Sequence, residues 1–169
     1  MNYKSSFSPL MLNLCVWVFL GFLAGPSLQA PLILRAASKT VKSGEEVCVE
    51  VAAQQFVNII SMQYSMKWDR KVLKFKEVRD FRLPGLSTAN FGQHQTAKGV
   101  LTFSWYDQNL RGITLRDGTI LYQVCFEAIG APGSKAYFRF VEFPTPVEIA
   151  NARSQFLQLE AHEGIIKVQ

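Results

Sequence analysis

Residues 59–68 read IISMQYSMKW and residues 100–106 read VLTFSWY. In both stretches a large apolar side chain occupies every second position, and most of the positions between them are polar. A repeat of two is the period of a β-strand that buries one face. Residues 47–51 (VCVEV) alternate in the same way. The sequence therefore predicts strands whose apolar sides pack into a common core.

The composition is that of one globular domain. The chain has 169 residues, of which 49% are hydrophobic and 18% charged, and this excludes a disordered polyelectrolyte. Thirteen Phe, three Trp and five Tyr supply enough apolar area for a sizeable core. The net charge of +5 is spread along the chain without a basic run, so we expect no nucleic-acid partner.

The first thirty residues have the pattern of a cleavable secretory signal. Lys4 precedes the apolar stretch 10–23 (LMLNLCVWVFLGFL), and small side chains follow it. About 14 apolar residues are fewer than the roughly 20 that cross a bilayer, so we expect no stable membrane span. Cleavage after Ala30 is one choice, and Ala24 and Ser27 are alternatives. The sequence thus predicts a signal peptide over residues 1–30 and a secreted domain over residues 31–169.

Turn residues divide the domain into short strands. Pairs such as Pro84-Gly85 and Asp117-Gly118 separate the alternating stretches, a spacing typical of a β-sandwich. Residues 147–162 are ambiguous between a helix and an irregular strand with a loop. We predict nine strands: Leu32 to Ala37, Glu46 to Ala53, Ile59 to Trp68, Leu73 to Val78, Ala89 to His94, Val100 to Tyr106, Ile120 to Ile129, Lys135 to Phe143 and Gly164 to Val168.

Several motifs occur in the order found in one known family. Residues 62–75 (MQYSMKWDRKVLKF) place an alternating strand before an aromatic-Asp pair and Val-Leu-x-Phe. Further along are GVLTFSW at residues 99–105, LRDGTIL at 115–121 and GIIKV at 164–168. With VKSGE at 41–45, these motifs cover Leu32 to Val168. In this respect the chain resembles the cohesin family.

The resemblance implies a nine-stranded jelly-roll β-sandwich that bacteria secrete or display on the cell surface. The best-known cohesins bind the calcium-loaded dockerin modules of polysaccharide-degrading enzymes and gather them into a cellulosome. We therefore expect a non-catalytic module with a dockerin-type partner and no cofactor of its own, since the calcium belongs to the dockerin. Carbohydrate-binding modules share the architecture, so direct polysaccharide binding is the alternative, and a structural adhesin domain is a third.

The polar positions of the two best-patterned strands are the candidate binding face. They must point away from the core, because successive side chains of a strand alternate between its faces. In cohesins the dockerin lies across a sheet formed partly by these two strands and partly by the eighth. By position, the residues that match are Gln63, Ser65, Thr102, Ser104 and Tyr106, with Tyr137 or Arg139 from the eighth strand. Half-exposed strands in general show similar residues.

Cys48 and Cys125 each lie in the middle of a predicted strand. In an oxidising compartment they can form a disulfide, and two buried free thiols are the equal alternative. A zinc site is not expected, because the chain has only two His and lacks both Cys-x-x-Cys and His-Glu-x-x-His. His94 and His162 are isolated in the sequence, and we predict no catalytic residue.

Other polar and aromatic residues fit structural roles. Trp68 and Trp105 share the phase of neighbouring apolar residues, which favours the core over a surface that stacks on sugars. Asp69 is expected to cap the turn that follows Trp68, and Asp107 and Asp117 occupy similar turn positions.

Overall fold

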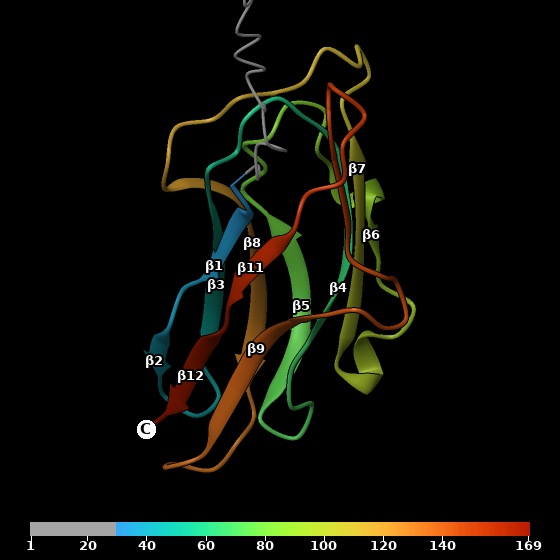
Figure 1. Ribbon diagram of the computed structural model, residues 1–169. Helices are drawn as coiled ribbons and strands as arrows, with labels where there is room; N and C mark the ends of the chain where they lie inside the picture. Colours follow the sequence, from blue (N-terminus) through green and yellow to red (C-terminus); the bar gives the residue numbers. More distant parts are fainter. Residues whose placement is uncertain (1–29) are drawn as a thin grey trace, which may run out of the picture.

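The computed structural model describes residues 30–169, which fold into two β-sheets packed face to face (Figure 1). Apart from Ala30, the predicted signal at residues 1–30 lies outside the described residues and stays a prediction. Across residues 30–169, no helix has the length and apolar character needed to cross a bilayer.

We call the sheet with the strand order β11-β1-β3-β8-β5 sheet A. The order in sheet B is β2-β12-β9-β4-β7-β6, and β10 also pairs with β4. The strands of sheet A are β1 (Leu32–Ala36), β3 (Glu46–Gln54), β5 (Leu73–Arg79), β8 (Thr119–Ala128) and β11 (Leu159–His162). Those of sheet B are β2 (Lys39–Val41), β4 (Ile59–Lys67), β6 (Phe91–Gly92), β7 (Val100–Tyr106), β9 (Lys135–Val141), β10 (Glu148–Asn151) and β12 (Gly164–Val168).

The core lies between the two sheets and is rich in aromatic rings. The alternation of the sequence places every second side chain of β3 and β7 inside, as their burial patterns show. Burying a large apolar side chain stabilises a fold by about 1.5–3 kcal/mol, so the many such residues here drive the packing of the sheets. The largest fully buried side chains include Trp105, Tyr64, Tyr122, Phe56, Phe103, Phe126 and Phe138.

Two tyrosine hydroxyls join the sheets inside this core. Tyr64 of β4 and Tyr122 of β8 share a hydrogen bond of 2.7 Å, and the Tyr122 hydroxyl also lies 3.2 Å from the sulfur of Met66. Burial raises the pKa of both hydroxyls above the ordinary tyrosine value. Because each polar group has a partner, the pair links β4 to β8 without leaving an unsatisfied group in the core.

The predicted all-β sandwich is confirmed, but the predicted strand Ala89 to His94 is largely wrong. The structure has a 3-10 helix at Thr88–Asn90 and only the two-residue β6 after it. A capping box competes with strand formation here. The Ser87 hydroxyl accepts a hydrogen bond from the Ala89 backbone N–H (3.3 Å), and the Asn90 side chain accepts one from that of Ser87 (2.9 Å).

Three further strands were not predicted. The ambiguous residues 147–162 form β10 and β11 and no helix, and Lys39–Val41 form β2. Each is short and lies at an edge, where pairing with a distant strand decides the conformation. β2 pairs with β12, β11 with β1 and β10 with β4. Residues 30–169 thus form twelve strands where nine were expected.

Cys48 and Cys125 form a disulfide, which decides between the two alternatives left open by the sequence. They face each other directly on the neighbouring strands β3 and β8, so the bridge links two strands of one sheet. Side chains alternate along these strands, and Cys48 therefore shares the outer face of sheet A with Glu46 and Glu50.

Candidate functional site

The outer face of sheet B brings most of the predicted binding residues together. The antiparallel register of β4 and β7 sets Gln63 opposite Ser104, and Ser61 opposite Tyr106. Thr102 lies on the same face of β7 as Ser104, two residues earlier in the strand. Because facing residues of neighbouring strands lie about 5 Å apart, these side chains form one continuous surface.

The other edge of β4 is shared by two strands. β9 pairs with its carboxyl-terminal half, where Lys67 faces Arg139, and β10 pairs with its amino-terminal half, where Gln63 faces Glu148. The chain passes from β9 to β10 through residues 142–147, which include the cis peptide bond Phe143-Pro144. On the outer face of sheet B, β4 is therefore flanked by β7 on one side and by β9 and β10, one after the other, on the other side.

Ser65 differs from the prediction, because its side chain is buried rather than exposed. The segment between β9 and β10 covers it. The Ser65 hydroxyl donates to the carbonyl of Thr145 (3.1 Å) and accepts from the backbone N–H of Thr145 (2.8 Å). In this position Ser65 holds the crossing segment against β4 and lies beneath the surface.

Gln63 is fixed in place on the outer face. Its amide donates to a carboxylate oxygen of Glu148 across the β4–β10 pair (3.0 Å). Thr102 packs closely against β6, and a Cβ added at Gly92 would meet the Thr102 hydroxyl. The polar residues of this face are thus held by the sheet and by one another.

Two exposed aromatic rings border this polar surface. Tyr106 is 61% exposed and Phe156 is 79% exposed. With them, Ser61, Gln63, Ser104 and Glu148 line a shallow hollow. We call this surface the plateau; it comprises Ser61, Gln63, Thr102, Ser104, Tyr106, Glu148 and Phe156.

Phe156 is a candidate residue that the sequence analysis missed. Its backbone forms an isolated β-bridge with Ala150, and the side chain of Asn151 accepts hydrogen bonds from the backbone N–H groups of Arg153 (2.9 Å) and Gln155 (3.0 Å). This turn fixes the backbone that carries the ring. An asparagine followed by polar residues and one isolated Phe is a signal that could have indicated it.

Arg139 lies at the opposite end of the face from Phe156, along β9. Its guanidinium sits over the ring of Tyr137, 4.7 Å from the ring centre, and its Nε donates to Glu163 (2.6 Å). Both Tyr137 and Arg139 are exposed, so the structure places both alternatives of the sequence analysis on the surface. Tyr137 and Arg139 line a second hollow together with Lys67, Lys135 and Asp69, so this end of the face carries charges of both signs.

Both candidate sugar-stacking tryptophans are buried, as predicted. Trp68 and Trp105 are 4% and 1% exposed. Their indole N–H groups donate to the carbonyl oxygens of Leu73 (3.1 Å) and Pro84 (2.8 Å). Neither ring is available for contact with a ligand.

The aspartates singled out from the sequence hold turns. Asp69 accepts from the N–H of Lys71, and Asp117 from that of Gln55. Asp107 accepts from the N–H groups of Asn109, Arg111 and Gly112, which together hold the pKa of its carboxyl below the ordinary aspartate value.

In sequence, no family model and no curated protein matches the chain. In structure it is similar to a cohesin of Clostridium thermocellum solved in a type I cohesin–dockerin complex (TM-score 0.70, 12% identity, covering 83% of this chain and 100% of that one). It is also similar to a Clostridium acetobutylicum structure named CaCohA2 (TM-score 0.64, 18% identity) and to a non-cellulosomal cohesin of the archaeon Archaeoglobus fulgidus (TM-score 0.60, 16% identity). Each of these two matches covers 83% of this chain and 92% of the other. The fold of this chain is therefore that of a cohesin domain.

Proposed function

We propose that this chain is a non-catalytic binding module that holds a dockerin-type protein module on its plateau. The observation that carries the proposal is the plateau itself: a preorganised polar surface on β4, β7 and β10, bordered by the exposed rings of Tyr106 and Phe156. Structures with the same fold include cohesins in complex with dockerins, which supports the choice of partner.

The chemistry of the plateau suits a helical protein partner. Hydroxyl groups and an amide can exchange hydrogen bonds with polar side chains of a helix, and exposed rings of this kind are typical anchors of protein interfaces. The backbones that carry Gln63, Tyr106 and Phe156 are fixed by strand pairing or by the Asn151 turn, so little backbone conformational entropy would be lost on binding.

The setting of this module is part of the proposal. The signal-like residues 1–30 and the disulfide both favour an extracellular location, since disulfides persist in oxidising compartments. We propose recruitment of polysaccharide-degrading enzymes as its context. Any calcium would belong to the partner module.

Direct polysaccharide binding is the second candidate. The hollow between Tyr106 and Phe156 has exposed rings that could stack on sugars, and Gln63 and Glu148 could bind hydroxyl groups. Protein binding is favoured because both tryptophans considered for stacking are buried.

A capture experiment tests the proposal. Immobilised residues 31–169 are exposed to the secreted proteins of the source organism, with calcium or with a chelator, and are tested in parallel for binding to insoluble cellulose and chitin. Capture of a protein that carries a dockerin-type module, lost with chelator and weakened by Tyr106→Ala, is expected. Retention by polysaccharide alone would establish the second candidate, and the absence of both would overturn both.

A further inference from the structure

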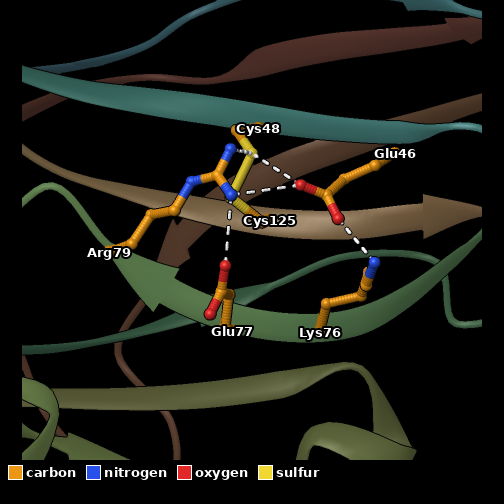
Figure 2. Close-up of a disulfide and its surroundings, with 6 residues drawn as sticks. All are labelled: Glu46, Cys48, Lys76, Glu77, Arg79 and Cys125. Carbon is orange, nitrogen blue, oxygen red and sulfur yellow. Dashed lines mark hydrogen bonds and ion pairs between the residues drawn. A yellow bond between two sulfur atoms is a disulfide. The ribbon is translucent and has the colours of Figure 1, made fainter.

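The disulfide lies on the outer face of sheet A, away from the core and from the plateau. Figure 2 shows Cys48 and Cys125 surrounded by the charged side chains of Glu46, Lys76, Glu77 and Arg79. Cys48 comes from β3 and Cys125 from β8, while Lys76, Glu77 and Arg79 come from β5, the next strand of the sheet. The bridge is thus a surface feature with an ionic environment.

The bridge joins residues that the sheet already holds together. On either side of it the β3–β8 pairing continues, with Val47 opposite Phe126 and Val49 opposite Val124. β8 is also paired with β5 on its other edge. Opening the bridge would therefore leave both strands in register and the core closed.

The two cysteine residues differ in exposure. Cys125 is fully buried, whereas Cys48 is partly exposed. Thiol–disulfide exchange begins when a thiolate attacks a sulfur atom that it can reach. In the folded chain Cys48 is the residue of the pair with exposed surface, so we expect the attack at its Sγ.

Arg79 supplies a positive charge at the same sulfur. Its Nη2 lies 3.0 Å from the Sγ of Cys48, and its Nη1 binds the carboxylates of Glu46 (3.2 Å) and Glu77 (3.1 Å). Lys76 binds the other oxygen of Glu46 (2.5 Å). These contacts hold the guanidinium beside the disulfide, and a carboxylate oxygen of Glu46 lies 3.8 Å from the same Sγ.

We propose that Cys48–Cys125 is an exchange site for low-molecular-weight thiols in the folded protein. A thiolate attacks the Sγ of Cys48 and forms a new S–S bond there. The Cys48–Cys125 bond breaks, its electron pair stays on the Sγ of Cys125, and that thiolate takes a proton from water. The product is a mixed disulfide on Cys48 and a free thiol at Cys125, and the reverse reaction closes the bridge. Arg79 is a positioning residue that stabilises the charge shared by the sulfur atoms during exchange.

Reaction with reduced glutathione in neutral buffer without denaturant tests this site. After an acid quench, peptide mass spectrometry locates the glutathione, and circular dichroism follows the fold. We expect glutathione on Cys48, none on Cys125, and an unchanged spectrum. Reaction only in denaturant, or an equal distribution over both cysteines, would overturn the proposal.

Two variants separate the role of Arg79 from general charge. Arg79→Gln is expected to slow exchange about fivefold, because it removes the cation beside the sulfur. Arg82→Gln is the matched control, since Arg82 pairs with Asp80, and within residues 30–169 no hydrogen bond or ion pair joins it to Cys48 or Cys125. Equal rates in the two variants would contradict the assignment of Arg79.

A single-cysteine variant gives a second, independent readout. In Cys125→Ala the thiol of Cys48 remains next to Arg79, and its titration can be followed by thiolate absorbance. We expect thiolate formation at lower pH than in the same variant carrying Arg79→Gln. Identical titration curves would show that the guanidinium does not act on this sulfur.

Discussion

The outer faces of the two sheets differ in how their polar groups are satisfied. On sheet A, charged side chains pair with one another across the strands: Lys76 with Glu46, and Lys74 with Glu127. On sheet B, the plateau carries hydroxyl groups, an amide, two exposed rings and a single carboxylate, Glu148, which accepts from the Gln63 amide. Removing water from a set of charges costs far more than removing it from hydroxyls and aromatic rings. This difference supports our proposal that a partner binds the outer face of sheet B and not that of sheet A.

The largest expected effect is on partner binding at the plateau. Replacing both Tyr106 and Phe156 by Ala removes the two exposed anchors, and we expect the dissociation constant for a calcium-loaded dockerin-type module to rise about a thousandfold, or about 4 kcal/mol. Titration calorimetry measures this. Unfolding by urea should be unchanged, because both side chains are exposed; a loss of stability equal to the loss of binding would contradict the assignment.

The disulfide of sheet A should matter for stability and not for binding. It closes a loop with a sequence separation of 77 residues, and its loss in a Cys48→Ala, Cys125→Ala double variant is expected to cost about 3 kcal/mol of the unfolding free energy. Urea denaturation measures this cost. Partner affinity should remain that of the unmodified chain, and a large drop in affinity would show that the two faces are coupled.

A smaller effect is expected for Ser65, which lies under the plateau face. Ser65→Ala leaves the backbone N–H of Thr145 without its acceptor and should lower the unfolding free energy by about 1–2 kcal/mol. Hydrogen exchange at Thr145 should become faster. Ser104→Ala is the control, because that side chain is exposed on the same sheet, and equal effects of both substitutions would refute the covering role.

The smallest expected effect is on how the unfolding free energy depends on pH, through the carboxyl group of Asp107. The pKa of this carboxyl is lowered in the folded state, so its contribution to stability is present above the ordinary aspartate value near 3.8 and is lost as pH falls through the lower folded value. Asp107→Asn should therefore be less stable at neutral pH, and the gap to the unmodified chain should shrink in acid. A gap that does not change with pH would contradict this origin.

Two of the three strands that carry the plateau, β4 and β7, could be predicted because their pattern is local. Met62, Tyr64 and Met66 alternate with polar residues, and a one-residue slip of register would expose all of them. For the same reason both tryptophans could be placed in the core. Gln63, Ser104 and Tyr106 occupy the positions between these buried residues, so they could be placed on the outer face.

The remaining features depend on contacts between distant parts of the chain. Ser65 has the phase of an exposed residue, and only the crossing of Thr145 buries it. Phe156 reaches the plateau through its bridge to Ala150, and this pairing has no period in the sequence. The bond between Cys48 and Cys125 likewise required the β3–β8 register, which spacing alone does not determine.

One pair of variants tests the assignment of the binding face most directly. Gln63→Arg and Gln123→Arg make the same substitution at two half-buried positions, and in each case a glutamate, Glu148 or Glu50, faces the new arginine across the strands. Gln63 lies on the plateau and Gln123 on the outer face of sheet A. In calorimetric titrations with a calcium-loaded dockerin-type module, we predict that Gln63→Arg weakens binding at least about thirtyfold and that Gln123→Arg binds like the unmodified chain. Unchanged binding by Gln63→Arg, or equal weakening in both variants, would contradict the plateau as the binding face.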